Sequence, residues 1–498
     1  MPRFLRGGRS SLLMVLAGVL VSASLATGAS AGDWPQFRGP NASGVAADAT
    51  NLPVEFSATE NVAWSKELGK GIACPVIAGG RCFSTALVGD QLFGIFCFDA
   101  LTGKELWKKE LKTGPLPDIM PPNEHASSTP VSDGERVYVY FSTLGMLAYD
   151  AATGKELWTS PIQQPFYLMG WGAAQSPILY QDMLIYSQDD DLDPFLTAID
   201  KYTGKVLWRT KRPEMLGGYA TPVMCTANGR TDLVVAGTGK MKGYNPATGE
   251  EIWTCNSLLR TIMTTPVVVD DRIFISVQSY GDTARVLKYA LLQWKDTNQD
   301  GKLEKSELAK QFWTKFDKGD GDGDGFLVDD EIDAAFQAPT NMVGGGNIIQ
   351  AIRGGGTGDV TDTHLIWNLD NSAPSNISSP LAVNGQLFLV KKGGISASFS
   401  TEDGSEVWDR RRIRNLGNYY ASPIAGDGKI YVAGENGFVV VLQQGDKPKI
   451  LARNDLRDSI VATPAIAENR LYVRTLKHLY CFKAGDGEPK AAAADSAE

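Results

Sequence analysis

Two acidic segments in this chain of 498 residues carry oxygen-bearing side chains at the alternating positions that a divalent cation requires. They run from Asp296 to Glu307 and from Asp320 to Glu331, and each is twelve residues long. Calcium takes roughly six to eight oxygen ligands, which a tight loop supplies from every second residue. A glycine at the sixth position permits the sharp bend, and a glutamate at the twelfth binds the ion through both of its oxygens. These segments therefore predict two calcium sites.

Both segments match the EF-hand calcium loop at its ligand positions. The backbone carbonyl of the seventh residue supplies one ligand, and a water serves at Val328. A solvated acidic loop is the alternative interpretation, but two matches in tandem, each with a leucine at the eighth position, favour calcium. The predicted ligands are Asp296, Asn298, Asp300, Lys302, Glu304 and Glu307 in the first loop, and Asp320, Asp322, Asp324, Phe326 and Glu331 in the second.

The two loops are closely spaced, so we expect one helix, from about Glu304 to Phe316, to leave the first loop and enter the second. Its apolar residues recur at steps of three and four, which is the spacing of a helix face. A further helix should enter the first loop, with apolar positions at Val286, Tyr289, Leu292 and Trp294. The segment 283–339 is thus predicted to form a compact EF-hand pair whose apolar residues pack on each other.

A repeat accounts for most of the remaining chain. A serine, threonine or cysteine followed by proline and an apolar residue recurs eight times, and each copy introduces a short β-rich run. The prolines are at positions 75, 130, 177, 222, 266, 380, 423 and 464. Eight copies predict eight equivalent structural units.

A second motif, Asp-x-x-Thr-Gly-Lys/Glu-x-x-Trp, lies between these steps at 99–107, 150–158 and 200–208, and in looser form at 245–253. The glycine permits a tight hairpin, and the aspartate can bond the backbone of the turn. The tryptophan should then lie on an outer strand and wedge between neighbouring sheets. Repeats of this length with short strands are typical of propellers, so we expect an all-β, eight-bladed β-propeller.

The spacing of the prolines locates an insertion. It is 41 to 55 residues except between Pro266 and Pro380, where it is 114 residues. Both predicted calcium loops fall in this interval, so the EF-hand pair should be inserted within blade five. The strand that contains Trp64 should complete the last blade and close the ring. We therefore expect an N-terminal extension at 32–60, the propeller at 61–483 and a disordered tail at 484–498.

The repeats resemble those of the pyrroloquinoline quinone (PQQ) type propellers over about 61–483. This family includes alcohol and sugar dehydrogenases, which bind the quinone beside a calcium ion at the propeller axis, and non-enzymatic relatives that assist outer-membrane protein assembly. The segment Asp33–Pro40 resembles the start of secreted PQQ-like propellers. The resemblance implies the fold, whereas activity has to be judged from the residues of the site.

The dehydrogenases of this family hold the quinone between a tryptophan and a disulfide of adjacent cysteines. The six cysteines of this chain, at 74, 82, 97, 225, 255 and 481, are all isolated, and no residues match the quinone's calcium ligands or its base. We therefore favour the non-enzymatic secreted branch and expect no PQQ. Cys82 and Cys97 flank the expected turn at Gly89 symmetrically, which is consistent with a disulfide or with two buried thiols.

Basic residues at 3, 6 and 9, an apolar run over 12–25 and small residues at 29 and 31 predict a signal peptide over 1–31. The protein should therefore be exported to the periplasm or beyond. No later apolar run reaches about 18 residues, so we expect no membrane span. The formal net charge is −9 and no basic stripe is present, which argues against a nucleic-acid partner. We expect a monomer.

Two functions from different classes fit these observations. The favoured one is an exported, calcium-binding propeller that acts as a binding or scaffold module, with a protein or small-molecule ligand at the funnel or on one face. The alternative is a periplasmic PQQ-dependent dehydrogenase, or another enzyme with an atypical site in the funnel. Its candidate groups are His125, Glu124 and Trp171, because His125 precedes a proline step near the expected funnel entrance. A structural role for His125 is the simpler interpretation.

Overall fold

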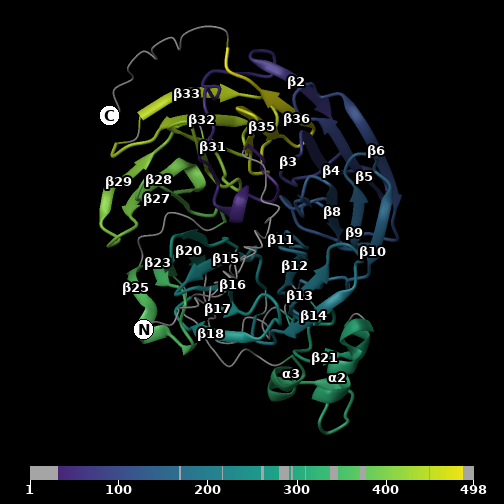
Figure 1. Ribbon diagram of the computed structural model, residues 1–498. Coiled ribbons are helices and arrows are strands. Elements are labelled where there is room, and N and C mark those ends of the chain that lie inside the picture. The colour runs from purple at the N-terminus through teal and green to yellow at the C-terminus, as the bar shows by residue number, and fades with distance from the viewer. Residues whose placement is uncertain are drawn as a thin grey trace, which may run out of the picture.

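The computed structural model describes most of the chain, and its ribbon forms a ring of sheets around a central axis (Figure 1). The expected signal peptide, most of the expected entering helix (Val286, Tyr289 and Trp294) and the tail from 486 lie outside the described residues. Within the described part, no helix is both long and apolar enough to cross a lipid bilayer. The described residues are 32–167, 170–215, 217–258, 263–279, 291–292, 295–308, 310–336, 346–370, 377–414, 416–447 and 449–485.

Eight antiparallel sheets of four strands form the blades of a β-propeller, with two blades each gaining a short parallel strand. Blades one to four are β3 (Val76–Ala78), β4 (Arg81–Gly89), β5 (Leu92–Asp99) and β6 (Glu105–Lys112); β7 (Val131–Ser132), β8 (Arg136–Phe141), β9 (Gly145–Asp150) and β10 (Glu156–Ser160); β11 (Ile178–Tyr180), β12 (Met183–Gln188), β13 (Phe195–Asp200) and β14 (Val206–Lys211); and β15 (Val223–Ala227), β16 (Arg230–Gly237), β17 (Lys240–Tyr244) and β18 (Glu251–Cys255).

Blades five to eight continue the ring, and the last one is completed by a strand from the N-terminal part of the chain. They are β19 (Val267–Val269), β20 (Arg272–Ser279), β23 (Gly346–Arg353) and β25 (Leu365–Asp370); β26 (Leu381–Val383), β27 (Gln386–Lys391), β28 (Ile395–Ser400) and β29 (Glu406–Arg412); β30 (Ile424–Gly426), β31 (Lys429–Ala433), β32 (Phe438–Gln443) and β33 (Lys449–Asp455); and β34 (Ala465–Ala467), β35 (Arg470–Arg474), β36 (His478–Phe482) and β2 (Val62–Glu67).

Each proline of the repeat stands immediately before the first strand of a blade, and these first strands neighbour one another around the axis. At six of the eight steps, the residue before the proline carries a hydroxyl that accepts a hydrogen bond from a backbone N–H of the preceding repeat. Examples are Cys74 N to Thr129 Oγ1 at 3.1 Å, Thr129 N to Ser176 Oγ at 3.0 Å and Ser422 N to Thr463 Oγ1 at 2.9 Å. The repeated Ser/Thr-Pro step therefore links successive blades near the axis.

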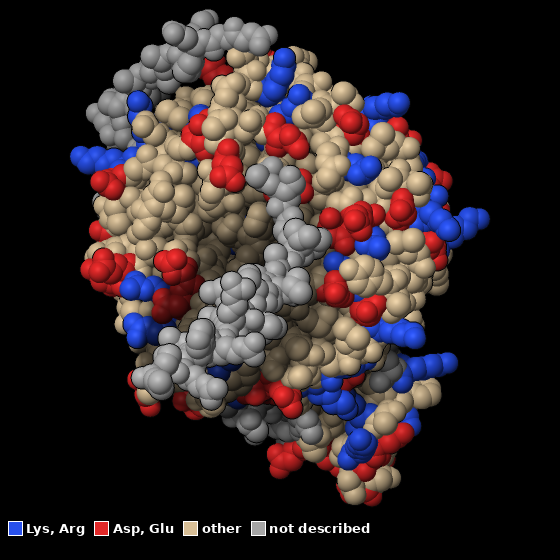
Figure 2. All heavy atoms as spheres, in the orientation of Figure 1, with Lys and Arg blue, Asp and Glu red and all other residues tan. Residues whose placement is uncertain are grey.

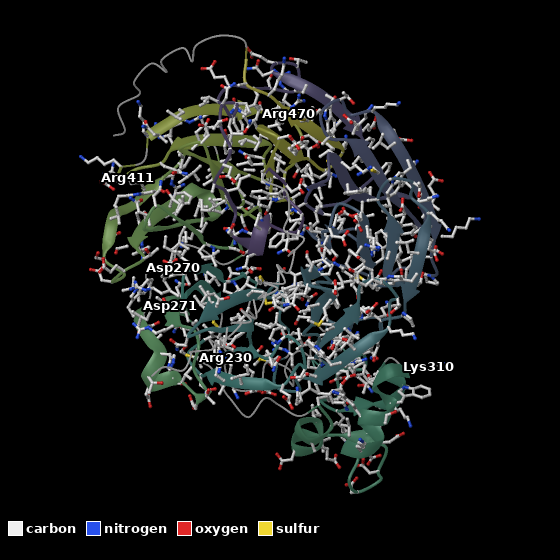
Figure 3. The ribbon with its side chains drawn as sticks, viewed as in Figure 1. Arg230, Asp270, Asp271, Lys310, Arg411 and Arg470 are labelled. Atoms are coloured by element: carbon white, nitrogen blue, oxygen red, sulfur yellow. The ribbon has the colours of Figure 1, made fainter. Side chains whose placement is uncertain are left out.

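The ring closes without a covalent bond, as the sequence predicts. Strand β2 pairs with β36, with Trp64 opposite Cys481, so the two ends of the propeller share blade eight. Arg470 of the same blade donates from Nη1 to the carbonyl of Leu101 in blade one at 2.7 Å (Figure 3). The ring is thus closed both by backbone pairing within blade eight and by a side-chain contact between blades eight and one.

Tryptophans on the outer strands link blades eight, one, two and three to the blade that follows each of them. The indole ring lies against the glycine of the neighbouring Thr-Gly turn, and its N–H donates to a backbone carbonyl of that blade. These bonds run from Trp64 to Ala100 at 2.8 Å, from Trp107 to Ala151 at 2.9 Å and from Trp158 to Lys201 at 3.0 Å. Apolar residues fill the remaining space between sheets, for example Phe93 stacked on Phe141 at 4.1 Å between blades one and two.

The N-terminal extension crosses the inner strands of several blades. Trp34 and Arg38 are fully buried, and Arg38 donates to the carbonyl of Pro380 in front of blade six. Asn41, in the short helix η1 (Pro40–Ala42), exchanges two hydrogen bonds with the backbone of Met224 in blade four. Strand β1 (Val45–Ala46) then pairs in parallel with β30. The segment is therefore part of the central structure of the ring.

A small helical unit lies between the second and third strands of blade five and is called the insertion below. It contains β21 (Leu303–Glu304), η2 (Lys305–Glu307), η3 (Lys310–Phe312), α2 (Trp313–Gly319), β22 (Phe326–Leu327) and α3 (Asp329–Phe336). The single helix expected from Glu304 to Phe316 is wrong, because Leu308 is extended, with φ −100° and ψ 140°, and separates η2 from the later turns. The remaining elements are β24 (Gly358–Asp359), α4 (Thr361–His364) and η4 (Lys392–Gly394).

The cysteines decide between the two alternatives that the sequence left open for Cys82 and Cys97, because all six thiols are free and buried. Cys82 pairs with Phe98 and Cys97 with Phe83, because the hairpin turns at Asp90–Gln91, beyond the expected turn, and the irregularity between Leu87 and Gly89 offsets only part of that shift. Adjacent positions on a strand face opposite sides of the sheet. Cys82 and Cys97 therefore belong to different inter-blade cores and do not form a disulfide.

Candidate functional site

The first acidic loop holds its carboxylates in place with backbone N–H groups. Asp296 accepts hydrogen bonds from the N–H of Gly301 at 2.8 Å and of Asp300 at 3.2 Å. Glu307 accepts from Thr297 N at 2.8 Å and from Glu304 N at 2.9 Å. These backbone bonds hold the pKa of Glu307 below its usual range, although partial burial acts in the opposite direction.

The middle of this loop gathers the other predicted side chains. The amide of Asn298 lies 3.3 Å from an oxygen of Asp300 and 3.4 Å from an oxygen of Glu304. Gly301 has a φ of +81°, a conformation that side chains rarely adopt, and permits the bend. The loop thus brings Asn298, Asp300 and Glu304 together, and Asp296 and Glu307 are bound to the same short stretch of backbone.

The second loop gathers three carboxylates more closely. Asp320, Asp322 and Asp324 each offer an oxygen within 4.8 Å of the others. Glu331 accepts from Gly321 N at 3.1 Å and from Val328 N at 3.2 Å, which turns its carboxylate toward the loop. Oδ1 of Asp320 is buried, and no donor among the described residues reaches it. A buried carboxylate oxygen without a donor is costly, and a cation would relieve that cost.

The two loops are joined by a short β-pair at their eighth positions. Leu303 pairs with Leu327, and Glu304 pairs with Phe326. Both leucines are fully buried in a core with Phe312 and Phe316. Oxygen is the only ligand type that the loops present, which suits calcium or magnesium better than a transition metal. The role of the Lys302 and Phe326 carbonyls as ligands stays a prediction.

A pocket of about 380 Å³ opens among the loops that connect blades one, two and three. Glu124 and His125 line it, together with Tyr140, Phe166 and Tyr167. Burial raises the pKa of Glu124 against the opposing effect of Lys70, and burial lowers the pKa of His125 against the opposing effect of Asp118. Burial thus shifts the pKa values of the two groups toward each other. The charged group that acts on His125 is Asp118.

Further polar residues support the walls of this pocket. The Tyr140 hydroxyl contacts Gln188, and the Tyr167 hydroxyl accepts from Gln175. Trp171 lies beside Tyr219 at a ring separation of 6.2 Å, and it does not line the pocket itself. Sequence reasoning missed Tyr140, Phe166 and Tyr167, because no motif connects loops that lie far apart in the chain.

The face of the molecule drawn in Figure 2 carries acidic and basic side chains in alternation. No broad basic area is visible on it. Elsewhere the ion pairs are structural, as with Arg230, whose guanidinium binds Asp232 at 2.6 Å and the carbonyl of Gly356 (Figure 3). The glycine-rich segment 354–356 is therefore a loop held between blades four and five.

Curated relatives match only part of the chain. The quinoprotein ethanol dehydrogenase of Pseudomonas aeruginosa is 33% identical over 141 residues, which are 25% of this chain and 21% of that protein. The quinoprotein alcohol dehydrogenase PedH of Pseudomonas putida is 33% identical over 137 residues, with the same coverage of 25% and 21%. The match thus spans about a fifth of the length of these relatives.

Solved structures and a family model cover far more of the ring. BamB from Moraxella catarrhalis superposes with a TM-score of 0.53 at 12% identity, over 85% of this chain and 99% of that chain. The quinohemoprotein alcohol dehydrogenase of Comamonas testosteroni gives 0.53 at 12% identity, over 92% and 82%. At such identities the likeness concerns the fold alone. The family model for the outer membrane protein assembly factor BamB matches residues 92–328 and 310–496, so this chain belongs to the BamB-type family of PQQ-like repeat propellers.

Proposed function

We propose that the protein is an exported, calcium-binding β-propeller that acts as a binding or scaffold module, with two calcium ions held by EF-hand loops in the insertion. The observation that carries this proposal is the geometry of the two loops. The β-pair between Leu303 and Leu327 joins them, and three carboxylates converge around the unpartnered oxygen of Asp320. The donors fit calcium because they are hard oxygens in flexible loops.

The scaffold role is supported by membership of a family whose model describes an assembly factor. Export is supported by the predicted signal peptide. We do not assign PQQ to this chain, because its isolated, buried cysteines cannot supply a disulfide of neighbouring residues. The partner or ligand would bind to the funnel or to one face of the ring, where loops from several blades meet.

Calorimetric titration with calcium tests the metal assignment. We expect two ions to bind in roughly the micromolar to millimolar range, since an exported site meets abundant calcium and need not act as a sensor. The double variant Glu307→Gln/Glu331→Gln should lose most of this binding, because each change removes the charge of the twelfth ligand.

The matched control is Asp317→Asn/Asp330→Asn, which removes the same number of charges from the insertion at positions that are not predicted ligands. It should retain two-site binding with a modest loss of affinity. Unchanged two-site binding in the glutamate double variant would refute the assignment.

The pocket favours a second candidate function, an enzyme that uses Glu124 and His125 as an acid–base pair. The support is the opposite shifts of their pKa values within one cavity. The similarity to quinoprotein dehydrogenases makes PQQ the first cofactor to test. If the scaffold proposal is correct, the visible absorbance spectrum should remain that of free PQQ after PQQ and calcium are added to the protein. A stoichiometric shift of the spectrum would favour the dehydrogenase instead.

A further inference from the structure

The insertion leaves the ring from blade five but packs against blade three. Phe312 of η3 meets Phe166, in the loop between blades two and three, edge to face at 4.4 Å. Leu192 of blade three also packs on the core of the insertion. In Figure 1 the insertion lies next to β14, in agreement with these contacts. The insertion thus passes blade four and touches a loop that is remote in sequence.

The loop that receives the insertion is also a wall of the pocket. Phe166 and Tyr167 line the cavity, and so does Lys295, the residue immediately before the first calcium loop. The backbone of Phe166 is fastened on its other side, where its N–H donates to Asp190 at 3.1 Å and its carbonyl accepts from Asp191 N at 2.9 Å. One short segment therefore joins the pocket to the insertion.

Charge makes this contact depend on cations. Residues 296–331 contain eleven acidic and five basic residues. The blade-three loop that they approach contains four aspartates, at 189, 190, 191 and 193, of which Asp189 pairs with Arg212 and Asp193 with Arg209. Lys315 of α2 is half-buried between the two surfaces and interacts with three of these aspartates. Two like-charged surfaces repel each other, and two calcium ions would offset most of the negative excess of the insertion.

The small size of the insertion also makes its folding depend on calcium. The insertion has only a small apolar core, and metal binding contributes directly to the folding of domains of this kind. Phe312 belongs both to that core and to the contact with Phe166. Without a folded core, Phe312 has no fixed position from which to support the wall.

We propose that calcium binding to the insertion controls the shape of the pocket, by docking Phe312 on Phe166 and placing Lys295 at the cavity. This inference rests on the proposed calcium function. Calcium-loaded protein has a complete wall, whereas calcium-free protein loses the support of residues 164–167 on one side.

Hydrogen exchange of the full chain, followed by mass spectrometry with calcium or with a chelator, tests the proposal. Calcium should slow exchange in peptides covering 161–175 by about tenfold, a change that corresponds to local stabilisation of that loop. Phe166→Ala should still bind calcium and protect the insertion, but should lose the calcium response at 161–175. The control is Leu207→Ala, which changes an exposed side chain on β14, the outer strand of blade three. This variant should behave like wild type.

Two results separate the possible failures. If calorimetry detects no calcium binding, the proposed function itself is wrong. If calcium binds but protection is confined to 295–336, or if Phe166→Ala responds like wild type, only the coupling to the pocket is refuted. The wild-type comparison suffices if Phe166→Ala does not fold.

Discussion

At the scale of single residues, a close fit occurs where an indole ring covers a turn glycine. Gly103 has a φ of +69°, and a Cβ atom there would lie 2.5 Å from Cγ of Trp64. Gly80 has nearly the same backbone conformation, with a φ of +72°, yet a Cβ atom there would meet nothing within 4 Å. Alanine variants at the two glycines therefore separate the free-energy cost of the backbone conformation from the cost of disturbing the packing of Trp64.

We expect Gly103→Ala to destabilise the protein more than Gly80→Ala. Both variants incur about 1–2 kcal/mol for the left-handed backbone, and Gly103→Ala adds about 1–3 kcal/mol because the alanine methyl displaces Trp64. Chemical denaturation followed by circular dichroism measures the difference. Equal losses in the two variants would show that the Trp64 contact is easily rearranged.

Among the elements, blade five combines a regular sheet with the long insertion between its second and third strands. Strands β20 and β23 pair along their whole length, and Ser279 lies opposite Gly346 where the described strands end. The two strand ends from which the insertion leaves and returns are thus close enough to be joined by a short linker. The sheet also keeps its pairing to β19 and β25, neither of which involves the insertion.

Excision of 283–339, bridged by a short Gly/Ser link, should therefore leave an eight-bladed ring. The cores between blades come from the blades themselves, and each blade contacts mainly its neighbours. The variant should keep its β-type circular dichroism and a cooperative melt, while calorimetry should detect no binding to EF-hand loops. Loss of the cooperative melt would show that the contact with blade three is needed by the whole ring.

The whole molecule depends on a closure made by a single strand. Trp64 stands on β2 and reaches from blade eight to Ala100 in blade one, just as Trp158 reaches from blade two to Lys201 in blade three. The closure is therefore built like the junctions that follow blades one, two and three. An open ring would instead expose a strand edge that can pair with other chains.

Trp64→Ala should destabilise the protein about as much as Trp158→Ala, by about 3–5 kcal/mol each. Trp313→Ala is the control, because this tryptophan lies on the insertion and is 38% exposed. Denaturation curves give the comparison. Truncation through Leu68 should go further and produce aggregates in light scattering, and a monomeric truncation with an unchanged melting temperature would contradict this account of closure.

The sequence by itself determined the features that are local in the chain. The Ser/Thr/Cys-Pro step recurs with each blade, and the Asp/Asn-x-x-Thr-Gly turn recurs in blades one to four. Counting the prolines therefore predicts eight blades, and the gap after Pro266 places the insertion in blade five. The candidate calcium ligands of each loop are equally visible in the sequence, because twelve consecutive residues contain all the ligands of that loop. Local turn chemistry and strand alternation act within a few residues, which is why a pattern can express them.

Only the tertiary structure decided what depends on register or on distant contacts. The position of the hairpin turn, at Asp90–Gln91, sets Cys82 opposite Phe98 instead of Cys97, and the symmetry of the spacing does not reveal it. The pocket draws its walls from loops of different blades, and Phe312 meets Phe166 only because the ring curves. Such contacts arise from the packing of whole sheets, whose relative placement is settled by burial between blades and leaves no periodic trace in the chain.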